Sequence, residues 1–143
     1  MSDDDRELRG ACLCGSVRFR ARGPFGPVAY CHCKQCRITH SHYVAYTAVP
    51  RANLTLETDE GLRWYRSSPE ARRGFCGTCG ARLFWNGDSR DYISIAAGCL
   101  DEPTGLQAAA HIFVRDKGDC YEITDGLPQH ETGRDSPLWS GGR

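Results

Sequence analysis

Seven of the nine cysteines fall in three short groups, at spacings that are typical of zinc ligands. Zinc is a borderline-soft ion, and thiolate sulfur binds it in both structural and catalytic sites. In chain order the groups are Cys12-Leu13-Cys14, Cys31-His32-Cys33-Lys34-Gln35-Cys36 and Cys76-Gly77-Thr78-Cys79. The sequence therefore predicts metal binding, with two zinc ions per chain if the seven sulfurs divide into four and three.

The first and third groups each supply half of a four-sulfur site. In an extended strand, residues two positions apart project to the same face, so Cys12 and Cys14 can present both sulfurs to one point. The spacing of Cys76 and Cys79 suits a tight turn that lets two sulfurs approach one metal at about 2.3 Å. Four thiolates fill the coordination sphere, so we expect this zinc to be structural.

The middle group supplies three sulfurs, Cys31, Cys33 and Cys36, and no fourth cysteine lies nearby in the sequence. Three protein ligands with one open position are typical of catalytic zinc. Three thiolates make the ion a weak Lewis acid, whereas a soft thiol substrate would bind as a nucleophilic thiolate. We therefore expect sulfur nucleophilicity at this site rather than hydrolysis.

Other arrangements of the same cysteines stay open. They are a disulfide framework, one zinc with spare thiols, and two structural zinc ions of which the second is completed by a histidine. The C-x-C pairs fit disulfide geometry poorly, and cytosolic thiols stay reduced. Cys99 and Cys120 have no partner at ligand spacing, so we expect them to pack in the core as small apolar residues.

The histidines divide by position. His32 lies between two ligands on an extended segment, so its side chain should project to the opposite face from their sulfurs and not bind the metal. His40 and His42 are candidates for a proton shuttle or a fourth ligand, and we include His42 with the three cysteines as catalytic. His111 and His130 have no sequence neighbours that indicate chemistry.

Three arginines and several aromatic residues lie near the third cysteine group. Arg66, Arg72 and Arg73 could bind substrate carboxylates through bidentate contacts, and the alternative is a solvated charge cluster. The aromatic residues alternate with other residues in short strand-like segments, so we expect most of them in the core.

The composition limits the class of protein. The chain has 143 residues, 40% of them apolar, which fits one compact domain. Lys plus Arg equals Asp plus Glu at 18 each, so no excess positive charge favours a nucleic-acid partner. The first residues contain no apolar run that resembles a secretory signal or membrane span, so we expect a cytoplasmic protein without a membrane partner.

Alternating apolar and polar positions separated by turn residues indicate a mainly β chain. We expect short single turns of helix after Cys33 and Pro69 and little other helix. The expected strands cover residues 16–21, 43–49, 54–57, 62–66, 81–85, 92–97, 111–114 and 121–123.

The cysteine groups and their flanks resemble a known family, the glutathione-dependent formaldehyde-activating enzymes, which includes centromere protein V. The similar segments cover residues 10–19, 31–37, 64–68, 73–80, 111–114 and 125–128. The sequence departs from the family at Ser41, where a glycine is usual.

The resemblance implies a β-tent-like single domain, in which zinc staples antiparallel sheets. It also implies reversible addition of glutathione sulfur to formaldehyde, which is carbon–sulfur lyase chemistry of the kind used in aldehyde detoxification. The partners are then a small-molecule thiol and an aldehyde. We place this domain at residues 8–130, with flexible termini at 1–7 and 131–143. The implied structural zinc ligands are Cys12, Cys14, Cys76 and Cys79, and the implied catalytic zinc ligands are Cys31, Cys33 and Cys36.

Two other functions stay open at this point. One is a non-catalytic, zinc-stabilised binding module, and the other is metal handling or redox sensing by labile thiolates. Zinc capped by a protein side chain would favour the first, and rapid zinc loss without unfolding would favour the second. The sequence does not define an oligomeric state.

Overall fold

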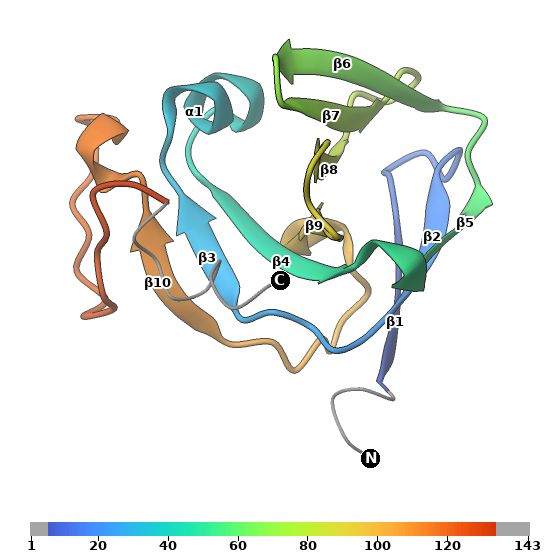
Figure 1. Cartoon of the computed structure of the whole chain (residues 1–143), viewed down its shortest axis with the longest axis horizontal. Coiled ribbons are helices and arrows are strands. Elements are labelled where there is room, and N and C mark those ends of the chain that lie inside the picture. The colour runs from blue at the N-terminus through green and yellow to red at the C-terminus, as the bar shows by residue number, and fades with distance from the viewer. Residues whose placement is uncertain (1–5, 134–143) are drawn as a thin grey trace.

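The computed structural model describes residues 6–133, which form two β-sheets and one short α-helix (Figure 1). The helix α1 spans Lys34–His40, and three turns of 3-10 helix are η2 Arg51–Asn53, η3 Ala97–Cys99 and η4 Val114–Asp116. The strands are β1 Glu7–Ala11, β2 Arg18–Arg22, β3 Val28–Cys31, β4 Val44–Pro50, β5 Leu54–Thr58, β6 Leu62–Ser68, β7 Ala71–Cys76, β8 Arg82–Gly87, β9 Tyr92–Ala96 and β10 Ala108–Ile112.

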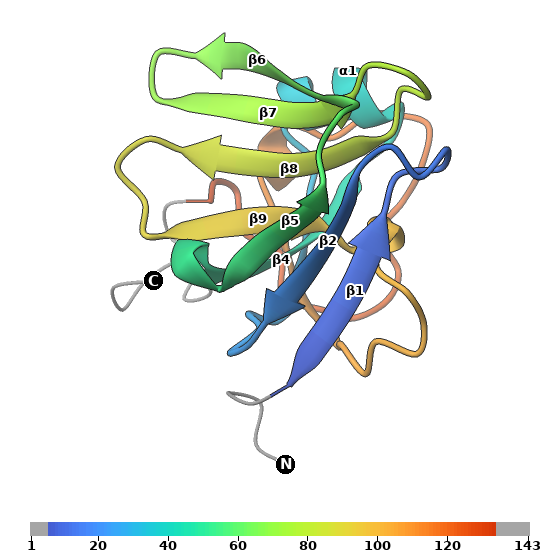
Figure 2. The ribbon, with the colours of Figure 1, turned by 90° about the vertical axis from the view of Figure 1, so that its right-hand side faces the viewer.

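The smaller sheet has the order β1-β2-β5, and all its pairs are antiparallel. Figure 2 shows it lying across one face of the larger sheet. The contact between the sheets is apolar: Phe19 of β2 meets Phe84 of β8 edge to face, with ring centroids 5.2 Å apart. Val49, Ile93 and Ile95 of the larger sheet are buried in the same core. This core fixes the position of the cysteines that flank it, Cys12 and Cys76.

The larger sheet has seven strands in the order β10-β3-β4-β9-β8-β7-β6. Its two ends curve toward each other, and α1 lies between them (Figure 1). The side-chain amide of Gln35 in α1 donates to the carbonyl oxygen of Ser67 in β6 at 3.0 Å, which ties the helix to the far end of the sheet. A second core, including Ala29, Val44 and Ile112, fills the hollow of this curve.

The mainly β fold with little helix confirms the prediction, and the helix after Cys33 is present, although it is longer than one turn. Four details were wrong. Residues 121–123 form no strand, and a hairpin turn between β6 and β7 replaces the helical turn expected after Pro69. The pair β10–β3 is parallel, because the chain returns from η3 through a long crossover to reach β3.

The fourth error concerns Cys120, which is exposed, because the segment that contains it is an irregular loop. Cys99 is half-buried and packs against both cores, as expected. Within residues 6–133 no helix is long and apolar enough to span a membrane. The flexible termini predicted at 1–7 and 131–143 lie mostly outside the described residues.

Candidate metal centres

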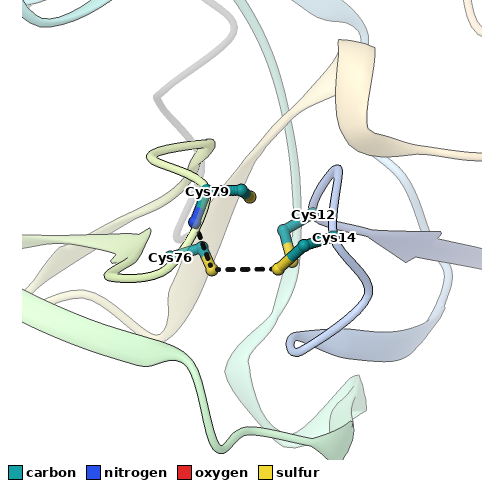
Figure 3. Close-up of side chains that lie close together, drawn as sticks. All are labelled: Cys12, Cys14, Cys76 and Cys79. Atoms are coloured by element: carbon teal, nitrogen blue, oxygen red, sulfur yellow. Dashed lines mark hydrogen bonds between the residues drawn. The ribbon is translucent and has the colours of Figure 1, made fainter.

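Cys12, Cys14, Cys76 and Cys79 come together where the two sheets meet, with ligand atoms that all lie within 4.8 Å of one another. Figure 3 shows Cys12 and Cys14 after the end of β1, with Cys76 at the end of β7 and Cys79 in the turn that follows. Cys12 and Cys14 lie in a tight turn, so the extended strand expected for them from the sequence is wrong. Gly15 and Gly80 follow the two cysteine pairs with φ of 84° and 81°, a left-handed conformation that glycine adopts without strain.

Hydrogen-bond donors surround these sulfurs. The backbone N–H of Val17 donates to the Cys12 sulfur at 3.2 Å, and that of Thr78 donates to the Cys76 sulfur at 3.3 Å. The Ser16 hydroxyl lies 3.2 Å from Cys76 Sγ. The Ser16 hydroxyl and then the Cys79 backbone N–H lower the pKa of the Cys76 thiol to about 5. The turn geometry therefore favours the thiolate form that metal binding requires.

The sulfur spacing fits a tetrahedral zinc. With Zn–S bonds of about 2.3 Å, the sulfurs of such a site lie about 3.8 Å apart. Cys12 Sγ lies 3.7 Å from Cys14 Sγ, and Cys14 Sγ lies 3.8 Å from Cys76 Sγ. A disulfide needs about 2.05 Å, and all nine cysteines are free thiols. The four-sulfur cluster can therefore hold a closed, structural metal ion.

Cys31, Cys33 and Cys36 form the second cluster, where β3 ends and α1 begins. Cys33 is the N-cap of the helix: its sulfur accepts a hydrogen bond from the backbone N–H of Cys36 at 3.3 Å. Cys31 and Cys36 are buried in the second core, whereas Cys33 is half-buried. Among the described residues, no fourth histidine, cysteine or carboxylate ligand atom joins this group within 4.8 Å.

The three thiols of this cluster influence one another's ionisation. Hydrogen bonds from Cys31 and Cys36 lower the pKa of Cys33 to about 2. Hydrogen bonds with Cys33 and Cys36, together with burial, raise the pKa of Cys31 well above its usual range. One thiolate is therefore favoured, and a bound cation is what would allow all three to ionise. This donor set fits zinc as well as the first cluster does.

A buried arginine contacts the three-sulfur cluster from the other end of the sheet. The Nη1 and Nη2 atoms of Arg73 lie 3.7 and 3.6 Å from Cys36 Sγ, and Nη1 donates to the Tyr46 hydroxyl at 3.3 Å. His40 Nε2 lies 3.4 Å from the same hydroxyl. Arg73 is only 8% exposed, so the solvated arginine cluster considered from the sequence is wrong for this residue. Its burial beside Cys36 depends on the curvature of the sheet, which no local pattern indicates.

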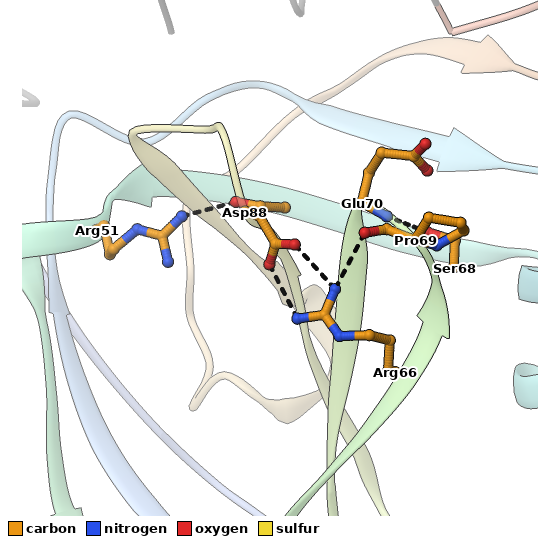
Figure 4. A network of polar contacts seen from close by, with 7 residues as sticks. Arg51, Arg66, Ser68, Pro69, Glu70 and Asp88 are labelled. Atoms are coloured by element: carbon orange, nitrogen blue, oxygen red, sulfur yellow. Dashed lines mark hydrogen bonds and ion pairs between the residues drawn. The ribbon is translucent and has the colours of Figure 1, made fainter.

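The other two arginines do not face the cluster. Arg66 donates to both oxygens of Asp88 at 2.8 and 3.1 Å in the exposed polar network of Figure 4. Arg72 stacks its guanidinium on Trp64, 4.2 Å from the ring centroid. Both side chains are engaged elsewhere, so the interpretation that they bind substrate carboxylates loses its support.

The histidines near the three-sulfur cluster differ in burial and in what they contact. His42 is exposed and packs against the rings of Tyr43 and Tyr121, at centroid distances of 4.3 and 4.4 Å. His32 is fully buried on the opposite side of its segment from the cysteine sulfurs, as expected, where its ring contacts His111 and the Tyr121 hydroxyl. No sequence pattern indicates the contact with His111, because 79 positions separate the two residues.

Comparisons with known proteins agree with this geometry. The sequence model of one family, described as glutathione-dependent formaldehyde-activating enzyme, matches residues 7–116. A Schizosaccharomyces pombe protein named an uncharacterized lyase is 28% identical over 123 residues, which cover 83% of this chain and 87% of that protein. A crystal structure of a Rhodobacter sphaeroides protein has a similar fold, with a TM-score of 0.58 and 22% identity, over 66% of this chain and 88% of the other.

The family match spans both cysteine clusters and every strand of the two sheets. It agrees with the resemblance seen in the cysteine spacings. The alignment with the lyase relative covers most of each protein. The chain therefore belongs to the family of glutathione-dependent formaldehyde-activating enzymes.

Proposed function

We propose that the protein is a zinc-dependent carbon–sulfur lyase that adds a thiol, glutathione or a similar one, reversibly to formaldehyde or another small aldehyde. The thiol loses its proton, a carbon–sulfur bond forms at the carbonyl carbon, and the carbonyl oxygen becomes a hydroxyl by taking up one proton. The observation that carries the proposal is the cluster of Cys31, Cys33 and Cys36, which offers three sulfurs and no fourth ligand among the described residues.

A zinc ion held by these three thiolates would bind the substrate thiol as a thiolate that is nucleophilic near neutral pH. The chain contributes rigidity around that position. Cys31 ends a paired strand, Cys33 caps α1, and Cys36 lies inside the helix, so the backbone holds all three sulfurs in fixed directions. The half-buried Cys33 leaves one side of the cluster accessible to ligands.

The four-sulfur cluster has a different role in this proposal. It lies between the sheets, where a metal ion would link the turn after β1 to the turn after β7. With Cys12, Cys14, Cys76 and Cys79 all engaged, it would stabilise the fold and bind no substrate.

The test is exchange spectroscopy on a mixture of formaldehyde, glutathione and zinc-loaded protein, which reports the rate at which the thiol adduct forms and breaks. We expect acceleration over buffer that is lost in Cys33→Ser and kept in Cys120→Ser, because Cys120 is exposed and outside both clusters. Absence of acceleration by protein that contains two zinc ions would reject the proposal and favour a non-catalytic binding module.

His42 keeps its proposed role in proton transfer. It is exposed on the loop between α1 and β4, so it could exchange protons with solvent. Loss of such a residue typically lowers the rate by about 100-fold or more. An unchanged rate in His42→Ala, measured in the same exchange experiment, would remove His42 from the mechanism.

A further inference from the structure

A small pocket opens beside the three-cysteine cluster, between the end of α1 and strands β4, β6, β7 and β8. Its free volume is about 20 Å³, which is room for only one or two heavy atoms. Its walls include His40, Tyr46, Tyr65, Arg73 and Arg82. Two of the residues that line it, Arg73 and Arg82, are arginines and none is acidic, so the pocket is positively charged.

Arg73 joins this pocket to the cluster. Its guanidinium contacts Cys36 Sγ and the Tyr46 hydroxyl, and the side chain is more than nine-tenths buried. Its Nε atom has no hydrogen-bond partner among the described residues. A guanidinium has five N–H donors, and leaving one unpaired in a buried position is unfavourable unless a ligand accepts its hydrogen bond. The geometry therefore leaves a donor for an oxygen acceptor.

His40 and Tyr46, which line the pocket beside Arg73, add no negative charge to it. Burial, followed by Arg73 and Arg82, lowers the pKa of His40 to about 4, so His40 is neutral at pH 7. Burial raises the pKa of Tyr46 far above its usual range, so its hydroxyl stays protonated. An arginine guanidinium stays protonated in proteins, so Arg73 carries a fixed positive charge. A fixed positive charge in a water-poor site stabilises negative charge that develops on a substrate oxygen.

We infer that this pocket binds the carbonyl group of the aldehyde and that the Arg73 guanidinium hydrogen-bonds to its oxygen. The inference rests on the proposed function and names the subsite for the electrophile. When the substrate thiolate attacks the carbonyl carbon, the carbon–sulfur bond forms and the π electrons move to the oxygen. The resulting oxyanion lies against Arg73 until it takes up a proton from solvent. This proton balances the one that the thiol released.

The small volume of the pocket predicts selection of the aldehyde by size. Tyr65, which is 63% exposed, lies at its outer wall, and the buried Phe84 and Gly74 form other parts of it. A one-carbon aldehyde fits in about 20 Å³, whereas each added methylene would need the walls to move. We expect Tyr65→Ala to raise the ratio of kcat/KM for acetaldehyde to that for formaldehyde by about tenfold, since one methylene in a pocket is worth about 10- to 200-fold.

The direct test observes the Arg73 Nε–H proton by NMR in the zinc-loaded protein. The resonance is assigned by its absence from Arg73→Lys, and sodium formate serves as a stable one-carbon oxygen ligand. We expect the resonance to shift saturably on addition of formate. No shift at concentrations that inhibit the enzyme would overturn the inference.

The kinetic test compares Arg73→Met with the matched control Arg72→Met, whose side chain lies on the neighbouring position of β7 and stacks on Trp64. Loss of one oxyanion donor typically lowers kcat by about 100- to 1,000-fold, so we expect such a fall for Arg73→Met, with less than a threefold change in KM for glutathione. Arg72→Met should stay within about twofold of wild type.

These outcomes separate the inference from the proposed function. An active wild type with an equally active Arg73→Met that retains both zinc ions would overturn the role of Arg73 and leave the lyase proposal intact. An inactive wild type in which formate still shifts the Arg73 signal would reject the lyase and support the pocket as a one-carbon oxygen-ligand site.

Discussion

The Nε2 atom of His32 lies 2.8 Å from the Nδ1 atom of His111, although the two residues are 79 positions apart. His111 Nε2 lies 2.8 Å from an oxygen of Asp125, and His32 Nδ1 contacts the Tyr121 hydroxyl. Chiefly through burial, the pKa of His32 falls to about 4, so its ring is neutral. One arrangement gives every ring nitrogen a partner: Tyr121 donates to His32, His32 donates to His111, and His111 donates to Asp125. These hydrogen bonds hold His32, and with it the segment between Cys31 and Cys33, in place.

This network makes His111 important for stability. In His111→Leu the buried Nε2–H of His32 loses its acceptor, and we expect the free energy of unfolding to fall by about 1–3 kcal/mol. Urea denaturation of the zinc-loaded protein measures this loss. His130→Leu is the matched control, because His130 contributes backbone bonds to His111 and Val114, which the substitution leaves in place. Equal stability of the two variants would show that the network does not stabilise the fold.

Zinc analysis should distinguish the two clusters. We expect two zinc ions per chain in wild type and in Cys120→Ser, and about one in Cys33→Ser with the fold retained, because the three-sulfur cluster lies at one end of the large sheet. Cys76→Ser should unfold or aggregate, since Cys76 is fully buried in the core between the sheets and metal binding is coupled to folding. Metal content and circular dichroism of each variant provide the measurement. A folded Cys76→Ser protein with one zinc would contradict the structural role.

Ser41 provides a prediction of increased stability. It is the C-cap of α1 with φ 68° and ψ 4°, a left-handed conformation that costs a non-glycine residue about 1–2 kcal/mol. Glycine adopts this conformation without strain. After allowance for the greater freedom of glycine in the unfolded chain, Ser41→Gly should raise the free energy of unfolding by about 0.5–1 kcal/mol. Thermal denaturation tests it, and a lower melting temperature would refute it.

The stability of the protein should fall in mild acid, partly through His40. Burial and the charges of Arg73 and Arg82 lower the pKa of His40 from 6.5 to about 4. Between these values the unfolded state binds a proton that the folded state does not, so the free energy of unfolding decreases as the pH falls from 6.5 to 4. The loss is at most about 1.4 kcal/mol per pH unit. It should be smaller in His40→Gln, measured by urea denaturation across this range, while zinc release affects both proteins alike. Equal slopes would rule out the His40 contribution.

Local pattern was enough for several elements. Alternation predicted β4, β6, β8 and β9, although exposure alternates clearly only at the start of β6, and β9 is buried at every position. It failed at residues 121–123, an irregular segment in which Tyr121 stacks on His32 without pairing as a strand. It also failed for Cys120, because a small apolar residue in an irregular loop has no periodic neighbours to indicate its exposure.

The sequence by itself determined which sulfurs form each cluster, because residues two or three positions apart must lie close together and zinc chemistry limits how such pairs combine. It could not determine what approaches those sulfurs. Arg73 reaches Cys36, and His111 reaches His32, only because the large sheet curves and the chain crosses over to add β10 beside β3. Both contacts span long stretches of chain, and their distances follow from sheet curvature and core packing. The tertiary structure therefore decided the pocket, the charge beside the cluster and the brace behind it.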